Sequence, residues 1–376
     1  MKLSFAHLGN MYIPLGELLR SLGLEVLVPP PTTRRTLERG ALHAPEFACL
    51  PLKVTVGNFL EAIELGADAF MMAGGIGPCR FGYYCELQRE ILRDLGHSVK
   101  LIALEPPRAY PREFFRDLRT LAGRSGLVRI VSAVKRAWLK ACSLDRLEQA
   151  ALVTRAREAT RGSVTRALAG ALARLDAADS EREVREATAE GLHAIQRCAR
   201  PWSPGESRSL RVGVVGEVYV VLEPFVNLGV AEKLGELGAE VVRPITFSGW
   251  VRENVYLDIL HPSGKPDRTR FASPYLNHAV GGHGLESIAC SVEMARDGVD
   301  GVVHLAPFTC MPEVVAQSIL PSVAEHEGMP IMSCVFDEHT GDAGLMTRLE
   351  AFVDLLAVRC ESRAAGGEAA CAGTSE

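Results

Sequence analysis

Three cysteines of this sequence lie beside or near proline, in short motifs between apolar segments. They are Cys49 in PEFACLPLK, Cys79 in GGIGPCRFG and Cys310 in PFTCMPE. Proline fixes the local backbone and carries no N–H, so it can hold a thiolate at a defined angle without competing for it. Neighbouring glycine and threonine N–H groups could donate hydrogen bonds to the sulfurs, which tune iron–sulfur clusters. Soft thiolates from separate loops suit a cubane with one open iron; the alternative is three buried, inert thiols.

The spacing of the ten cysteines argues against several common kinds of metal and redox site. No C-x-x-C pair occurs, which argues against zinc ribbons, thioredoxin-like redox sites and bacterial ferredoxins. A reducing cytosol also disfavours a disulfide framework. Cys85 begins the helical pattern that follows Cys79 and could face the same cavity as an additional ligand. Packing or tolerated exposure is expected for the others, which are Cys142, Cys198, Cys290, Cys334, Cys360 and Cys371.

The elements that must position these cysteines follow an α/β rhythm in two parts of the chain. Short apolar segments bounded by Gly or Pro alternate there with helical patterns. The segments expected to form strands are KLSFAHL, EVLVPP, DAFMMAG, VKLIALE, RVGVVGEVY, AEVVRP, GVVHLAP and MPIMSCVFDE. We therefore predict an α/β protein with two Rossmann-like (doubly wound) domains, at 1–107 and 206–360. A helical region at 108–205 separates them, and a small, polar segment at 361–376 is expected to be a disordered tail.

The two α/β parts show a weak internal duplication. GNMYIPL (9–15) resembles GEVYVVLEP (216–224), and LGADAFMMAGGIGPC (65–79) resembles DGVDGVVHLAPFTC (297–310). Both Cys79 and Cys310 then follow the carboxyl end of a predicted strand, where open α/β sheets bind ligands. Chance similarity between two α/β units is the alternative. A phosphate-binding role for GGIGPCRFG is weaker, because the segment lacks both the Gly-Lys-Ser/Thr end of a P-loop and the GxGxxG order.

Composition describes an ordinary globular chain. It is 47% hydrophobic and 23% charged, and its net charge of −5 argues against a general nucleic-acid binder. The N-terminus lacks the layout of a signal peptide, and no uninterrupted apolar stretch could span a bilayer. These features predict a soluble, cytoplasmic protein that binds neither nucleic acid nor membrane. Between 108 and 200, however, 19 Lys and Arg face 11 Asp and Glu, which indicates either solvated helix faces or a docking surface for an acidic partner.

Several polar residues in the cysteine motifs admit two interpretations. Lys53 and Arg80 follow the first two cysteines, and could bind a CoA phosphate, stabilise cluster charge, or be ordinary exposed cations. Glu313 is expected to complement the dipole at the start of a helix rather than to transfer protons. His283 and His304 could lie near the site, although a lone histidine is more often a satisfied core residue.

Long and unusual motifs give the chain a family resemblance. They are HLGNMYIPL, PEFACLPLKVTVGNF, GGIGPCRFGYY, EPFVN, VGGHGLES, HLAPFTCMPE and DEHTGDAGLMTRLEAFVDLL, spread from residue 7 to about residue 356. The chain resembles the 2-hydroxyacyl-CoA dehydratase D-component (2-hydroxyglutaryl-CoA dehydratase-like) family. Within that family it is most similar to the branch called CoA protein activase or activase-related protein. The helical middle of the chain carries little of this resemblance.

The resemblance implies an oxygen-sensitive protein of anaerobic electron-transfer chemistry. It implies a [4Fe-4S] or double-cubane iron–sulfur cluster between the two α/β domains, with Cys49, Cys79 and Cys310 as the ligands. Low-potential electrons would come from an ATP-dependent activator, an ATPase of the actin/Hsp70-like fold. A paralogous subunit or a second copy would complete the assembly. The family's dehydratases perform radical chemistry on CoA thioesters, and its double-cubane relatives reduce small molecules.

The family does not decide whether this chain is itself an enzyme, because function resides in sites and not in folds. Three classes remain open. The chain could be an electron-accepting component of a dehydratase-like lyase or a reductase. It could be a non-catalytic iron–sulfur scaffold or electron relay, or a cluster-free α/β binding protein.

Overall fold

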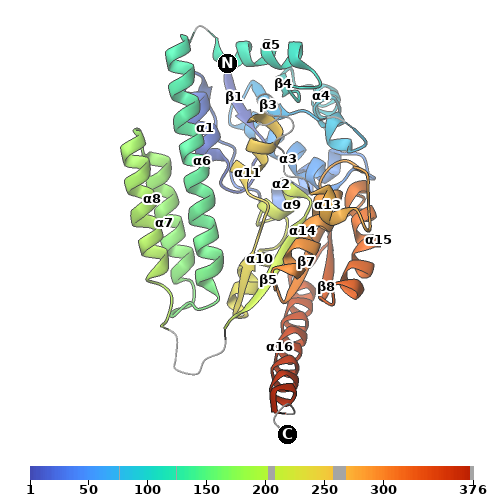
Figure 1. Cartoon of the computed structure of the whole chain (residues 1–376). Helices are drawn as coiled ribbons and strands as arrows, with labels where there is room; N and C mark the ends of the chain where they lie inside the picture. The colour runs from blue at the N-terminus through green and yellow to red at the C-terminus, as the bar shows by residue number, and fades with distance from the viewer. Residues whose placement is uncertain (76, 124, 202–207, 257–267, 373–376) are drawn as a thin grey trace.

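Two α/β domains and a helical region make up the chain in this computed structural model. It describes residues 1–75, 77–123, 125–201, 208–256 and 268–372. Each domain is built on a four-stranded, all-parallel sheet with helices against it (Figure 1). The α/β fold class with two Rossmann-like domains is therefore confirmed. Among the described helices none is both long and apolar enough to cross a membrane.

All eight segments expected to form strands do so. The first sheet contains β1 (Lys2–Phe5), β2 (Glu25–Val26), β3 (Ala69–Ala73) and β4 (Lys100–Leu104). The second contains β5 (Leu210–Gly216), β6 (Ala239–Val242), β7 (Gly301–Pro307) and β8 (Ile331–Phe336). Their orders are β2-β1-β3-β4 and β6-β5-β7-β8, so each strand has a counterpart at the same position in the other sheet. This agrees with the duplication that the sequence indicated.

Helices cover both sheets and form most of the middle of the chain. Those of the first domain are α1 (Tyr12–Ser21), α2 (Arg34–His43), α3 (Leu50–Glu64), the 3₁₀ turn η1 (Arg80–Tyr83), α4 (Tyr84–Asp94) and α5 (Pro111–Ala122). The middle contains α6 (Leu127–Arg155), α7 (Ser163–Ala177) and α8 (Glu181–Gln196). The second domain contains α9 (Val218–Leu222), α10 (Val230–Glu236), α11 (Phe247–Val251), the π-helical η2 (Arg252–Tyr256), α13 (Thr269–Ala272), α14 (Gly284–Arg296), α15 (Met311–His326) and α16 (Asp342–Ala372).

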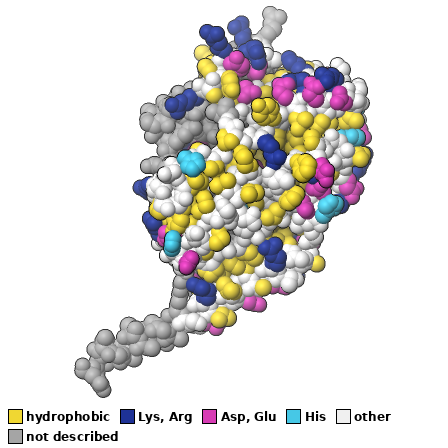
Figure 2. All heavy atoms as spheres, turned by 90° about the vertical axis from the view of Figure 1, so that its right-hand side faces the viewer, with side chains coloured by type: hydrophobic (Ala, Val, Ile, Leu, Met, Phe, Trp, Pro, Cys, Tyr) yellow, Lys and Arg dark blue, Asp and Glu magenta, His cyan; other side chains and the backbone are white. Residues whose placement is uncertain are grey.

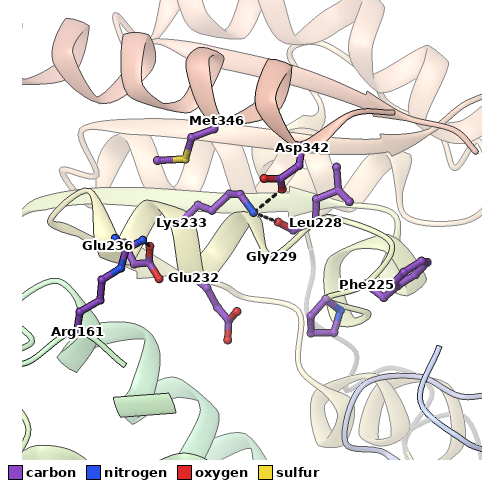
Figure 3. A pocket seen from close by; sticks show the side chains of 10 residues that line it. Arg161, Phe225, Leu228, Gly229, Glu232, Lys233, Glu236, Asp342 and Met346 are labelled. Atoms are coloured by element: carbon purple, nitrogen blue, oxygen red, sulfur yellow. Dashed lines mark hydrogen bonds and ion pairs between the residues drawn. The ribbon is translucent and has the colours of Figure 1, made fainter. Parts of the chain in front are cut away.

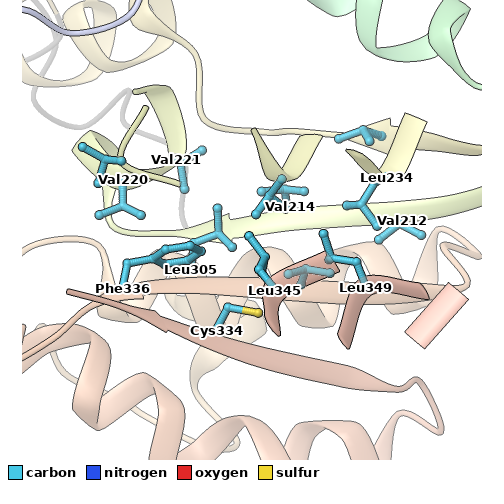
Figure 4. Close-up of a cluster of buried hydrophobic side chains, with 14 of the residues drawn as sticks. Val212, Val214, Val220, Val221, Leu234, Leu305, Cys334, Phe336, Leu345 and Leu349 are labelled. Atoms are coloured by element: carbon cyan, nitrogen blue, oxygen red, sulfur yellow. The ribbon is translucent and has the colours of Figure 1, made fainter. Parts of the chain in front are cut away.

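Helix α3 is the buried element between the two domains. Its sequence is apolar around most of its circumference, which is typical of a helix enclosed on all sides. One face of it packs in the core of the first domain along its length, from Leu52 to Leu60. Leu50 and Val54 instead belong to the core of the second domain, which forms around β5, β7 and α16 (Figure 4). The cores are therefore not separated at the domain boundary.

The helical region is attached to both domains. Helices α6, α7 and α8 pack on one another around a core of their own, to which α1 contributes Ile13. Helix α6 also contacts the second domain, where Arg243 pairs with Glu148 at 2.6 Å. Helix α5, which lies in the predicted helical region at 108–205, packs on β4, and its Leu121 joins the buried cluster around β1 and β3. The second predicted boundary, between 205 and 206, falls outside the described residues.

The C-terminal segment differs from the prediction of a disordered tail at 361–376. Helix α16 continues to Ala372 and extends away from the body of the protein (Figure 1). Ala, Glu and Arg are good helix formers, and adding residues to an existing helix needs no new nucleation. Residues 373–376 lie outside the part of the chain that the structure describes.

Candidate cysteine site between the two domains

The three proline-flanked cysteines share one structural position. Cys49 is the N-cap residue of α3, Cys79 of η1, which runs directly into α4, and Cys310 of α15. An N-cap side chain lies beside the backbone N–H groups that a first helical turn leaves without partners. Helix N-termini also favour negative charge and lower the pKa of a cysteine placed there. The prolines that follow Cys49 and Cys310 stand within the first turn, where a missing N–H costs nothing.

Two of these helix N-termini follow equivalent strands of the two sheets. Cys79 follows β3 and Cys310 follows β7, the corresponding strand of the second sheet. Glycines of the loop before α14 allow a close approach to Cys79. A Cβ on Gly281 would lie 2.9 Å from the backbone nitrogen of Cys79, and one on Gly282 would lie 3.6 Å from its sulfur. Both glycines also have positive φ, which side-chain-bearing residues rarely adopt.

The pKa values of the three thiols depend on charged groups that they share. Burial raises the pKa of Cys49, Cys79 and Cys310, and the carboxylate of Glu217 raises all three further. The charge of a Cys49 thiolate also acts on Cys310, and that of a Cys79 thiolate acts on Cys49. Cys49 and Cys310 are buried, whereas Cys79 is partly exposed. Glu217 is therefore close enough to each of the three cysteines for its charge to act on the thiol.

Backbone N–H groups do face two of the sulfurs, but they are not those expected from the sequence. The N–H of Phe81 acts on Cys79 and the N–H of Glu313 acts on Cys310, and each lowers the pKa of the thiol. Neither arrangement reaches the geometry of a full capping hydrogen bond. The donors therefore come from the first turns of the helices and not from the neighbouring glycine and threonine.

Arg80 connects the loops that carry the three cysteines. Its Nη1 donates to the carbonyl oxygen of Phe47 at 2.7 Å, just before Cys49. Its Nη2 donates to Thr309, just before Cys310, through the carbonyl oxygen and through Oγ1 at 3.1 Å. The hydroxyl of Thr309 in turn donates to Phe47 at 3.2 Å. Arg80 is exposed, yet its guanidinium is occupied by contacts to Phe47 within the first domain and to Thr309 of the second.

Buried polar groups line the site on two sides. The sulfur of Cys49 lies 2.5 Å from the hydroxyl of Tyr84. Behind Cys310, Glu313 and His304 are fully buried, with Oε2 of the glutamate 2.8 Å from Nε2 of the histidine. Ser287 donates to the same Oε2 at 2.9 Å, while Oε1 of Glu313 has no partner in the structure. Glu313 stands in the first turn of α15, as expected from the sequence, and it is also a buried, hydrogen-bonded carboxylate.

The remaining sequence candidates lie elsewhere or have other partners. Cys85 is buried on α4, and its pKa is raised to about 11 by burial, while Arg89, 3.7 Å away, opposes the rise. The carboxylates that act on Cys85 do not include Glu217, so its surroundings differ from those of the other three. Lys53 is not an exposed cation: it is buried and pairs with Glu338 at 2.5 Å.

Cysteines assigned to packing behave accordingly where the structure describes them. Cys290 is buried on α14 in an apolar cluster, and burial raises its pKa to about 12. Cys334 is buried in β8 within the core of the second domain. The side chain of Cys371 lies outside the described residues.

Large apolar side chains are exposed in the segments that carry the three cysteines. Between 44% and 75% of each residue is exposed in a group that consists of Phe47, Tyr83, Phe308, Met311 and Val314. We call this group the apolar rim. Each member lies within a few residues of one of the three cysteines. Figure 2 shows that hydrophobic side chains are spread over the face of the molecule that carries α4 and α15.

A surface pocket of about 550 Å³ lies apart from the cysteines, between α10 and α16 (Figure 3). Four of its five charged side chains are paired with each other, and the fifth, Glu232, pairs with Arg155. Lys233 contacts Asp342 at 2.8 Å, and Arg161 contacts Glu236 at 2.6 Å. This pocket therefore offers a ligand few charged groups that are not already engaged.

Cys49, Cys79 and Cys310 suit a metal centre by the type of their donor atoms, and not by a preformed arrangement. Among the described residues, no three or more His, Cys, Asp or Glu side chains stand in an arrangement ready to hold a metal ion. The donors themselves nevertheless suit an iron–sulfur cluster, because three thiols from separate segments meet at helix N-termini near one another. The orphaned Oε1 of Glu313 shows that the polar groups beside Cys310 are not all satisfied by the protein alone.

Sequence reasoning missed four contributors to this site: Tyr84, Glu217, Thr309 and the Gly281–Gly282 pair. Glu217 was detectable, since it follows Gly216 at the end of β5 just as Asn10 follows Gly9 in the aligned segment of the first half. The glycine pair stands in the motif VGGHGLES. Nothing in the sequence marks Thr309 or Tyr84. Comparison of the chain with protein-family models and with curated proteins found no match.

Proposed function

We propose that this chain is an iron–sulfur protein of the 2-hydroxyacyl-CoA dehydratase-like type. Cys49, Cys79 and Cys310 would hold a [4Fe-4S] or double-cubane cluster. The protein would accept low-potential electrons from an ATP-dependent activator for reductive or radical chemistry, with a CoA thioester as the candidate substrate. The motifs named above support the family. The observation that supports the proposal is that three cysteines from distant segments are each the N-cap residue of a helix and are each influenced by the charge of Glu217.

The residues of the chain have defined tasks in this proposal. Backbone N–H groups at two helix N-termini favour the thiolates of Cys79 and Cys310, and Tyr84 favours that of Cys49, whereas burial favours the protonated thiols. Because burial raises the pKa of each thiol, cluster loading releases protons to solvent. When bound, the cluster would supply one-electron transfer at low potential. The apolar rim would exclude water once a substrate or a partner subunit covers it.

Iron and sulfide analysis of protein purified under strict anaerobic conditions tests the proposal. We expect brown, oxygen-sensitive protein with roughly cubane stoichiometry. Cys79→Ser should give folded protein that is depleted in iron. Cys142→Ser is the matched control, because Cys142 lies on α6 beside Ser248 and away from the site. Equal iron in the two variants, or colourless wild-type protein that is well folded, would refute the cluster.

The same preparation separates the other two classes of function. Iron-free wild-type protein would leave a cluster-free α/β binding protein. If iron is present, reduction by an activator with ATP and a reductant distinguishes an electron acceptor from an inert scaffold. Turnover of an acyl-CoA substrate under these conditions would show an enzyme, and reduction without turnover would show a relay.

A further inference from the structure

Thr309 has a backbone conformation that its side chain disfavours. Its φ is +64°, in the left-handed region that glycine and asparagine occupy readily. Among the described residues only one other non-glycine residue, Leu228, has positive φ. Threonine is β-branched, which makes the conformation more unfavourable still. Residues persist in such conformations when their surroundings hold them there, and they cluster at functional sites.

The surroundings that hold Thr309 come from the other domain. Arg80 donates to both its carbonyl oxygen and its hydroxyl, and that hydroxyl donates to the carbonyl oxygen of Phe47. Arg80 also donates to Phe47 directly. The three residues therefore form a closed set of hydrogen bonds across the domain boundary. Each of them lies within two residues of one of the three cysteines.

We propose that Arg80 and Thr309 form a cross-domain clamp that holds the Cys310 segment against the first domain before any cluster binds. Its importance for iron retention rests on the function proposed above, but the clamp itself acts in the metal-free protein. Thr309 places Cys310 at the N-cap of α15, and Arg80 keeps Thr309 in its disfavoured conformation. Arg80 is thus a positioning residue, which acts through Thr309 and Phe47.

The guanidinium is suited to this task by its shape and not only by its charge. Its nitrogens lie in one plane at fixed angles, so that it reaches two carbonyl oxygens and a hydroxyl at once. A lysine has one ammonium on a flexible stem and cannot reproduce that fork. Arg80→Lys therefore keeps the positive charge near the thiols and removes the clamp. Thr309→Gly keeps the backbone conformation accessible, removes the hydroxyl and frees the segment to adopt others.

The experiment compares wild type, Arg80→Lys, Thr309→Gly and the control Arg93→Lys. Arg93 is an exposed arginine on α4 that pairs only with Glu90 and Asp94 in the described structure. Hydrogen exchange of the metal-free proteins is read for peptides that cover 45–49 and 307–313. Iron is then measured after anaerobic reconstitution and desalting, together with the thermal midpoint of each metal-free protein.

We expect exchange in both segments to be at least about tenfold faster in Arg80→Lys, as the loss of charge-assisted hydrogen bonds predicts. Iron retention should fall in Arg80→Lys and in Thr309→Gly, while the midpoint of Thr309→Gly stays at or above that of wild type. Exchange and iron equal to wild type in Arg80→Lys would overturn the clamp, because charge alone would then suffice. If wild type itself binds no iron, the proposed function fails, and the exchange data still decide the clamp.

Discussion

The sulfur of Cys49 and the hydroxyl oxygen of Tyr84 lie 2.5 Å apart, at the N-termini of two different helices. Burial raises the pKa of Tyr84 well above its ordinary value, and the neighbouring Cys49 raises it further. The phenol therefore stays protonated and can donate a hydrogen bond to a thiolate. Hydrogen bonds to ligand sulfurs are one of the means by which proteins raise the potential of an iron–sulfur cluster.

Replacement of Tyr84 by phenylalanine should therefore change the potential more than the iron content. The ring remains buried against Phe81, while the hydrogen bond to Cys49 is lost. If this hydrogen bond favours the reduced cluster over the oxidised one by about 1 kcal/mol, its loss lowers the one-electron potential by about 40 mV. Anaerobic redox titration measures the shift. An unchanged potential with full iron would show that Cys49 does not ligate the cluster or that Tyr84 turns away on loading.

Glu217 should make the stability of the metal-free protein depend on pH. Burial raises its pKa to about 7, although N–H groups of Val220 and Tyr219 oppose the rise. Between the unfolded value near 4.5 and about 7, the folded state holds a proton that the unfolded state releases. The contribution of Glu217 to stability is therefore full below pH 4.5 and is lost as pH rises to about 7. The loss is on the order of 3 kcal/mol.

Glu217→Gln imitates the protonated carboxyl and should remove this dependence. We expect the variant to match wild type at pH 5 and to be more stable at pH 8, as measured by urea unfolding under reducing conditions. Glu38→Gln, at an exposed position on α2, is the control and should not alter the pH profile. Parallel curves for wild type and Glu217→Gln across this range would contradict the assignment.

Gly281 is predicted to be needed for the position of Cys79. A Cβ there would meet the backbone nitrogen of Cys79 at 2.9 Å, and backbone cannot move aside as a flexible side chain can. Gly298 has similar positive φ but no neighbouring atom within 4 Å, which makes it a matched control. Alanine at either position should cost about 1–2 kcal/mol through backbone strain. Only Gly281→Ala should also lose iron, and equal iron in both variants would show that the loop does not shape the site.

Lys53 and Glu338 should contribute to stability as a coupled pair between the domains. Lys53→Met leaves Glu338 without this partner in a partly exposed place, which should cost about 1–2 kcal/mol. The double variant Lys53→Met with Glu338→Leu should recover much of that loss, since no unpaired charge remains. Arg182→Met, which breaks an exposed pair on α8, should change stability by less than about 1 kcal/mol. Additive losses in the double-mutant cycle would show that the pair is uncoupled.

The sequence by itself determined the eight strands, the α/β class and the place of two cysteines at strand ends. The hydrophobic period and the Gly and Pro residues that bound each segment are local signals. Parallel strands that are buried on both faces appear in the sequence as short apolar runs. The duplication could be read for the same reason, since LGADAFMMAGGIGPC and DGVDGVVHLAPFTC each describe one strand and its exit loop. Cys49 was singled out by its proline, which stands in the first turn of a helix.

Only the tertiary structure decided how these segments meet. Arg80 and Thr309 are 229 residues apart, and no pattern in the sequence relates a guanidinium to a strained threonine in another domain. Lys53 looks like a surface cation in sequence, yet its partner Glu338 is supplied by the second domain. Helix α5 is a similar case: it packs on the first sheet because Leu121 is buried in the cluster around β1 and β3. Long-range contacts depend on the packing of distant elements, and a local pattern carries no information about them.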